Sequence, residues 1–239
     1  MRVNADFSVP VVIAADNLRW TTWVASPQAG VERVMLDRIG VEKARATSIV
    51  RYAPGSEFPT HQHPGGEEIL VLAGTFSEGD AHHGLGSYLR NPPGSAHRPA
   101  SAPGALLFVK LWQMPPHEHR RVRVDTRNPL AWQAVDDSAV CPLFDDAAER
   151  VWLERRPAGA DLTPDTACGA EVLVLNGALV HAGQTLAAGS WLRMPPGPCP
   201  PLSAGQDGVT VYLKTGHLSA LAAQGSAAGQ GGWSHGADA

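Results

Sequence analysis

The chain has 239 residues, of which 44% are hydrophobic and 18% are charged, and its formal net charge is −4. This balance is typical of a globular protein and argues against a nucleic-acid partner, which would require a basic surface. No apolar run is long enough to cross a bilayer and the N-terminus lacks a signal-peptide layout, so we expect a cytoplasmic protein with no membrane partner.

The chain contains many short segments with strand-like composition. Its 20 prolines and 25 glycines separate runs rich in Val, Ile, Leu and Thr, a pattern that predicts short strands joined by turns. Helix is expected only as a turn or two over Asp145–Val151. Short, evenly spaced strands favour a jelly-roll barrel. The predicted strands are Glu32–Asp37, Ala46–Tyr52, Glu68–Phe76, Gly86–Arg90, Ala105–Gln113, Glu149–Arg155, Ala170–Val180, Gly189–Arg193 and Gly208–His217.

An internal repeat divides the chain. Three segments recur at an offset of 103 to 104 residues: Glu68–Gly74 with Glu171–Gly177, Gly86–Gly94 with Gly189–Gly197, and Leu107–Lys110 with Val211–Lys214. We therefore predict a first domain over residues 1–126 and a second over 127–218. The join near residues 115 to 130 carries the charged run His117–Arg123 and is expected to be an exposed connection. Residues 219–239, rich in Ala, Gly and Ser, are predicted to form a flexible, low-complexity tail.

Two repeated runs are apolar at consecutive positions. Ile69–Leu72 and Val172–Leu175 have the composition of strands that are covered on both faces. We expect one face of each to pack the two barrels together.

Three imidazoles and a carboxylate lie on two short segments of the first copy. His61 and His63 are two residues apart, so on an extended strand they share a face. A Pro-Gly-Gly turn follows, Glu67 begins the next strand, and His97 arrives after a second turn. We predict that these four residues bind one divalent transition metal; zinc, iron, manganese and nickel all accept these donors.

The same spacing resembles a known family. Gly55-x5-His61-x-His63-x3-Glu67-x6-Gly74, followed by Gly86-x5-Pro92-x-Gly94-x2-His97, resembles the two cupin motifs, and the flanking residues resemble ChrR-type cupins. The resemblance implies an all-β fold of two tandem cupin barrels, of the double-stranded β-helix or jelly-roll type. It also implies that His61, His63, Glu67 and His97 are the metal ligands, with zinc favoured.

Two departures from the family pattern matter. A ChrR anti-sigma factor has a separate zinc-binding domain with a His-x3-Cys-x2-Cys motif, whereas this chain has no cysteine before Cys141. A sigma factor is therefore not an expected partner. In the second copy, Ala170 stands where Glu67 would be and Pro200 where His97 would be, so we expect no metal there. We expect a homodimer.

Other conspicuous residues have less specific interpretations. Because Glu68 and Arg90 recur as Glu171 and Arg193, where no metal is expected, we assign them structural roles. The three cysteines are predicted to be free thiols, although a two-thiol metal site from Cys168 and Cys199 is an alternative. His82 and His83 are expected in a solvated hairpin, Tyr88, Phe58 and Trp112 are candidates for the barrel mouth, and no residue is assigned as catalytic.

Three functions remain open from the sequence. The first is a module that senses a small molecule or oxidative stress and has a regulatory role, as the ChrR resemblance implies. The alternative is a metal-dependent dioxygenase acting on small diketones or hydroxy-ketones, as in some relatives of this group. The third is a structural metal that stabilises the strands.

Overall fold

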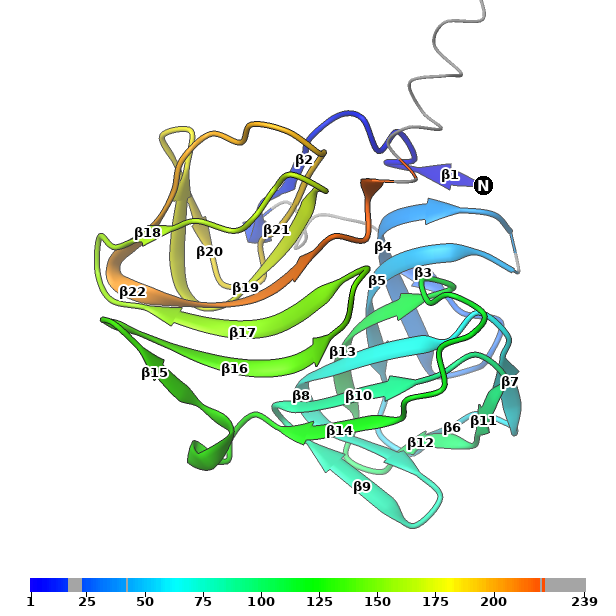
Figure 1. The fold of residues 1–239 in the computed structure, drawn as a ribbon. Coiled ribbons are helices and arrows are strands. Elements are labelled where there is room, and N and C mark those ends of the chain that lie inside the picture. The colour runs from blue at the N-terminus through cyan, green and yellow to red at the C-terminus, as the bar shows by residue number, and fades with distance from the viewer. Residues whose placement is uncertain (17–22, 42, 220, 222–239) are drawn as a thin grey trace, which may run out of the picture.

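The protein consists of two strand-rich barrels that lie side by side, as the computed structural model in Figure 1 shows. The model describes residues 1–16, 23–41, 43–219 and 221. The predicted all-β fold is confirmed, and the two repeated segments form matching sheets. The predicted tail lies almost entirely outside the described residues.

The first barrel is built on an antiparallel sheet with the strand order β1-β4-β5-β13-β8-β10-β14, to which four short strands and a separate two-stranded ladder are added. The main strands are β1 (Arg2–Val3), β4 (Val31–Ile39), β5 (Arg45–Tyr52), β8 (Glu67–Glu78), β10 (Ser87–Asn91), β13 (Ala105–Leu111) and β14 (Val122–Asp125). The shorter strands are β3 (Val24–Ala25), β6 (Ser56–Glu57), β9 (Ala81–Gly84) and β12 (Pro99–Ser101), and the ladder is β7 (His61–His63) with β11 (Ser95–His97).

The second barrel repeats this arrangement with the order β15-β16-β17-β22-β19-β21-β2, in which β2 spans Val11–Ile13. Its strands are β15 (Gln133–Val135), β16 (Ser138–Asp145), β17 (Arg150–Arg156), β18 (Asp161–Leu162), β19 (Ala170–His181), β20 (Gln184–Ala187), β21 (Trp191–Met194) and β22 (Leu202–Thr215). The short 3-10 helix η1 (Pro129–Ala131) precedes β15.

Successive side chains of β8 and β19 point alternately into a barrel and towards the other barrel, which explains how the two barrels pack together. Ile69 and Val71 point into the first barrel, while Leu70 between them belongs to a cluster shared by both barrels. In the same way, Leu173 of β19 joins the shared cluster and its neighbours Val172 and Val174 fill the second barrel. Successive side chains on a strand face opposite ways, so each central strand is covered on both faces. The predicted packing of the barrels through these runs is confirmed.

The N-terminal segment contributes to both sheets. β1 pairs with β4 in the first sheet, whereas β2 (Val11–Ile13) pairs with β21 and extends the second sheet. The backbone carbonyls of Asn4 and Asp6 accept hydrogen bonds from Arg193 of the second barrel. The start of the chain therefore ties the two barrels together.

One sequence prediction about an individual segment is wrong. Asp145–Val151, expected to contain a helical turn, is a tight reversal between β16 and β17. Asp146 accepts hydrogen bonds from the backbone N–H groups of Ala148 and Glu149, which stabilises the reversal. The charged connection between the barrels is mostly exposed, as predicted, although Glu118 is buried and β14 pairs with β10.

No helix in the described part of the chain is long and apolar enough to span a bilayer. The cysteines Cys141, Cys168 and Cys199 are free thiols.

Candidate metal centre

Three histidines meet on a small ladder at the wall of the first barrel. β7 and β11 pair antiparallel with His97 opposite His61, which puts both on the face that carries His63. The three ring centroids lie 4.7 to 4.9 Å apart. One nitrogen from each ring lies within 4.8 Å of the other two, close enough for all three to share one ion.

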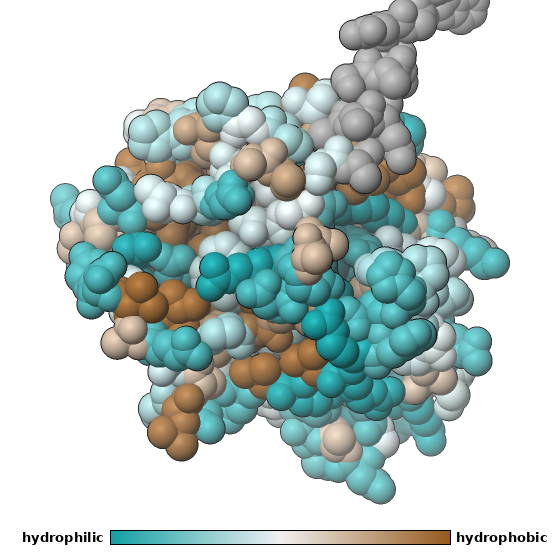
Figure 2. Space-filling model, viewed as in Figure 1, coloured by the Kyte–Doolittle hydropathy of each residue, from teal (hydrophilic) through white to brown (hydrophobic). Residues whose placement is uncertain are grey.

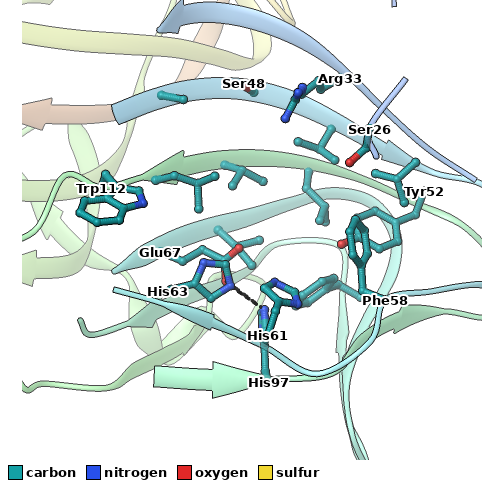
Figure 3. A pocket seen from close by; sticks show the side chains of 18 of the residues that line it. Ser26, Arg33, Ser48, Tyr52, Phe58, His61, His63, Glu67, His97 and Trp112 are labelled. Carbon is teal, nitrogen blue, oxygen red and sulfur yellow. Dashed lines mark hydrogen bonds and ion pairs between the residues drawn. The ribbon is translucent and has the colours of Figure 1, made fainter. Parts of the chain in front are cut away.

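Glu67, the fourth predicted ligand, lies beside this cluster. Its Oε2 is 3.5 Å from Nε2 of His63 and 3.5 Å from Nε2 of His97. Asn91 donates a hydrogen bond of 3.2 Å to the same oxygen and holds it on the cavity side of β8. The structure therefore brings all four sequence-predicted residues together (Figure 3).

The turn between β7 and β8 depends on its two glycines. Gly66 has φ +75°, in the left-handed region that favours glycine. A Cβ on Gly65 would lie 2.5 Å from the Trp112 ring, which covers the turn. The Pro-Gly-Gly sequence therefore allows the close approach that puts His63 and Glu67 on one side.

Hydrogen bonds fix which histidine nitrogen faces the cluster. Nδ1 of His61 lies 3.0 Å from the carbonyl oxygen of Pro59, and Nδ1 of His97 lies 2.6 Å from Oε1 of Glu78. Both partners accept, so each Nδ1 carries the proton and each Nε2 presents a lone pair. Such outer hydrogen bonds are typical of metal-binding histidines.

The donor atoms of the three histidines and Glu67 are arranged so that they can bind a cation. Nε2 of His63 and Nε2 of His97 face each other at 2.9 Å. Because Glu78 holds the proton of His97 on Nδ1, Nε2 of His97 presents a lone pair, and Glu67 adds a negative charge. Three nitrogens and one carboxylate oxygen are a donor set that divalent transition metals accept, so the residues fit a metal ion.

Glu78 is a functional residue that the sequence analysis missed. Besides His97, it accepts hydrogen bonds from Arg123 at 2.7 Å and Asn91 at 3.1 Å. Burial raises the pKa of Glu78, but these hydrogen bonds and charges outweigh it and lower the pKa to about 2. It lies eleven residues after Glu67 on the same strand, between the two motifs, so their spacing gave no signal for it.

The electrostatic environment differs between the histidines. Burial lowers the pKa of His63, which favours the neutral, ligating form. Burial also opposes the charged form of His97, but its hydrogen bond to Glu78, with the charges of Glu67 and Glu78, raises its pKa above the ordinary value. Glu78 thus makes the His97 imidazole more basic, which strengthens it as a ligand.

The cluster opens into a cavity of about 270 Å³ inside the first barrel. Its walls include Ile69, Leu107 and Val109, with Phe58 and Trp112 as predicted for the mouth. Figure 3 shows the histidines on one side and Arg33 and Ser48 on the other. Tyr88, the third mouth candidate, is instead fully buried in the cluster between the barrels, because its position on β10 faces that way.

Within the described residues, the three histidines are the one group of three His, Cys, Asp or Glu side chains close enough to share an ion. The interior of the second barrel is filled with apolar side chains, and the buried Ala170 begins β19 where Glu67 begins β8. The other two conspicuous histidines lie on β9, which pairs with β8 in a hairpin: His82 contacts Ser77 and His83 contacts Glu78.

Comparison with known proteins agrees with this geometry. Residues 10–115 match the family model of the ChrR cupin-like domain. No curated protein matches the chain in sequence.

Solved structures share the fold over most of the chain. A candidate dioxygenase from Nostoc punctiforme PCC 73102 has a TM-score of 0.70 at 16% identity, covering 88% of this chain and 84% of that one. A bacterial pirin from Escherichia coli, in complex with nickel(II), has a TM-score of 0.62 at 12% identity and coverages of 87% and 99%. Salicylate 1,2-dioxygenase from Pseudoaminobacter salicylatoxidans, as adducts with gentisate, has a TM-score of 0.62 at 12% identity and coverages of 94% and 85%.

Proposed function

We propose that this chain, in which residues 10–115 belong to the ChrR cupin-like domain family, is a metal-dependent dioxygenase acting on a small organic molecule. The observation that carries the proposal is the position of the four donor side chains. They lie at the wall of a largely apolar cavity that has room for a substrate beside them. A metal with a purely structural role would not require such a cavity.

The donors are His61, His63, His97 and Glu67, which would hold one ion. When bound, a transition metal such as iron(II) supplies a Lewis-acid and redox centre for a substrate oxygen and for dioxygen. Both oxygen atoms enter the product in a dioxygenation, so the substrate supplies the electrons and no further reductant is needed. The residues of the chain provide the site, orient the substrate and exclude water.

The barrel walls suit an apolar substrate body with a few oxygen atoms. The apolar side chains of Phe58, Phe76, Leu107 and Val109 line the cavity. Small diketones and hydroxy-ketones fit this description, and cleavage of a carbon–carbon bond is the reaction we infer for them. Burial and the nearby charge of Glu67 raise the pKa of Tyr52, which keeps its hydroxyl protonated near neutral pH.

The test begins with protein purified without oxygen. Elemental analysis separates zinc, the ion favoured by sequence, from iron, manganese and nickel. Oxygen uptake is then measured with pentane-2,4-dione and related diketones. We expect His61→Ala and His97→Ala to lose most of the bound metal and all oxygen uptake; full metal occupancy in both variants would disprove the assignment of the site.

A second candidate is a sensing module that binds metal and ligand without turnover. The match to the ChrR cupin-like domain supports it, because that family is named for a regulatory protein. Tightly bound zinc together with no oxygen uptake on any diketone would favour the sensor over the enzyme.

A further inference from the structure

Two arginines from β4 line the same cavity as the metal-site histidines. Arg33 and Arg38 both contribute to its wall. The Nε atom of Arg33 is fully buried and has no hydrogen-bond partner. Arg38 donates a hydrogen bond to the backbone carbonyl of Val41. Among the described residues, neither guanidinium forms an ion pair with a carboxylate.

Among the residues that the structure describes, the two arginines whose side chains are fully buried, Arg90 and Arg193, are paired with acids. Arg90 lies 3.1 Å from Glu68 and 2.6 Å from Glu149, and Arg193 lies 3.4 Å from Asp37. A guanidinium that is taken out of water without a partner costs free energy, so proteins compensate for it. Arg33 is only partly buried, but it lines the cavity and, within the described part of the chain, its Nε has no hydrogen-bond partner and its guanidinium has no carboxylate, so it can pair with a group from outside the chain.

The charge balance of the cavity points the same way. Of the residues that line it, Glu67 is the one carboxylate, and it faces the histidines. Arg33, Arg38 and a divalent ion at the histidines would together give the cavity a clear positive charge. Since low-dielectric walls strengthen such a field, an anionic ligand is favoured over a neutral one.

The position of Arg33 suits recognition of a carboxylate. Successive side chains of β4 point to opposite faces of the sheet. Val31 and Arg33 point into the barrel, whereas Val34 belongs to the apolar cluster shared by the two barrels. Figure 3 shows Arg33 opposite the histidines, with the hydroxyl groups of Ser48 and Ser26 beside it. The cavity of about 270 Å³ corresponds to roughly nine water molecules, the size of a small organic acid.

We propose that the barrel binds small oxo-carboxylates, with the carboxylate on Arg33 and Ser48 and the oxo oxygens directed to the metal position that the three histidines would hold. This inference rests on the proposed function and narrows its substrate class to diketones that carry a carboxylate. Arg33 is the specificity-determining residue, because a guanidinium offers two parallel N–H donors to a carboxylate. The apolar walls contact the carbon chain between the two ends.

The experiment compares a charged ligand with its neutral analogue. Binding of 2,4-dioxopentanoate and of its methyl ester is measured by calorimetry on the full chain, both loaded with zinc and stripped of metal. The variants are Arg33→Met, which removes the charge at similar size, and Arg33→Lys, which keeps it. Arg51→Met is the matched control, since Arg51 is exposed on the neighbouring strand and pairs with Glu32.

We expect the wild type to bind the acid at least tenfold more tightly than the ester. Arg33→Met should weaken acid binding roughly 10- to 100-fold while leaving ester binding and metal content unchanged. Arg33→Lys should recover part of the loss and Arg51→Met should bind as the wild type does. Equal binding of acid and ester by the wild type, or unaltered acid binding in Arg33→Met, would overturn the proposal.

An inorganic anion is tested as the alternative ligand. If phosphate binds more tightly than 2,4-dioxopentanoate and this binding also depends on Arg33, the site recognises inorganic anions and the proposed substrate class is wrong. If phosphate binds only weakly, the organic acid is supported.

The outcomes also separate this inference from the proposed function. In one result, the metal-free protein binds the acid in a way that depends on Arg33, but the metal-loaded protein takes up no oxygen. That result would support the ligand class and contradict the dioxygenase. The opposite result has two parts: Arg33→Met leaves oxygen uptake with pentane-2,4-dione unchanged, and it also leaves binding of the acid unchanged. That result would support the dioxygenase and contradict the ligand class.

Discussion

His97 is held by a carboxylate from the far end of the neighbouring strand. Glu78 accepts a hydrogen bond from Nδ1 of His97 and is itself fixed by Arg123 and Asn91. The ring of His97 therefore has one proton position and one orientation before any ion arrives. Partners of this kind set both the geometry and the basicity of a metal-binding histidine.

Replacing Glu78 by Gln should weaken metal binding without unfolding the barrel. The amide has nearly the same shape but lacks the charge, so it holds the Nδ1 proton of His97 less firmly. We expect zinc affinity to fall roughly 10- to 100-fold, measured by competition with a chelator.

The matched control for this variant is Glu57→Gln. Glu57 also pairs with an arginine, Arg98, but its side chain is 59% exposed and lies away from the histidines. Its zinc affinity should equal that of the wild type. If Glu78→Gln also kept wild-type affinity, Glu78 would have no part in orienting the ligand.

The sequence was sufficient to predict the four donors because three of them are close together in the chain and His97 lies in the second motif. His61 and His63 share a face through the two-residue period of a strand, and Glu67 follows after one turn. Glu78 and Arg33 could not be predicted in this way. They reach the site only because β8 runs past β12 and because β4 closes the opposite wall, which are properties of the assembled sheet.

At the scale of elements, the turn between β7 and β8 sets the spacing of two ligands. Gly66 has a positive φ there, and a Cβ would meet Sδ of Met114 at 2.5 Å and the carbonyl oxygen of Asn91 at 3.2 Å. The turn therefore depends on glycine for two reasons, backbone conformation and crowding. Gly79, in the turn between β8 and β9, has φ +59° but no neighbour within 4 Å, so it shares only the first reason.

Gly66→Ala should be more harmful than Gly79→Ala. The left-handed backbone costs an alanine about 1 kcal/mol or more in either turn. Gly66→Ala should lower the free energy of unfolding further and also reduce zinc affinity, because it displaces His63 and Glu67. Denaturant unfolding and a zinc titration of both variants check this; equal effects of the two substitutions would contradict it.

The strands themselves were largely predictable, whereas their partners were not. The nine predicted strands all occur, with ends shifted by a few residues. The pairing of β2 with β21 joins segments about 180 residues apart, and a three-residue strand has no periodicity to detect. β14 follows a run of charges that suggested a linker, yet it pairs with β10 because its valines, Val122 and Val124, pack against the shared cluster.

At the scale of the molecule, the repeated charges form a reciprocal network between the barrels. Lys110 of the first barrel lies 2.5 Å from Glu171 of the second, and Lys214 of the second lies 2.8 Å from Glu68 of the first. All four side chains are buried beside the shared apolar cluster. The repeat in the sequence predicted a structural role for Glu68, but only the fold shows that each acid takes its lysine from the other copy.

Lys214→Met should therefore destabilise the whole protein. The substitution leaves Glu68 buried with one fewer cation, and breaking one side of a buried pair typically costs about 3 to 5 kcal/mol. The double variant Lys214→Met with Glu68→Gln should lose less than the sum of the single variants. Lys43→Met, at an exposed position, is the control for denaturant unfolding; additive losses at positions 68 and 214 would contradict a coupled pair.

The same interface should make the stability of the protein depend on pH. The side chain of His217 is 3% exposed and its Nε2 lies 2.5 Å from Glu171. Burial lowers the pKa of His217 to about 4, even though the hydrogen bond to Glu171 acts in the opposite direction, and the charges of Lys214 and Lys110 lower it further. In the unfolded chain a histidine has a pKa of about 6.5.

Between these two values the unfolded chain binds a proton that the folded chain does not, so the free energy of unfolding falls as the pH falls from about 6.5 towards 4. At pH 5.0 the loss relative to pH 7.5 should be about 2 kcal/mol from this group alone. Urea unfolding of the metal-free protein at both pH values, compared with His217→Asn, isolates the contribution, because every other ionisable group is the same in the two proteins. We expect the variant to lose less stability between pH 7.5 and 5.0 than the wild type; the same loss in both would show that His217 does not remain neutral in the folded protein.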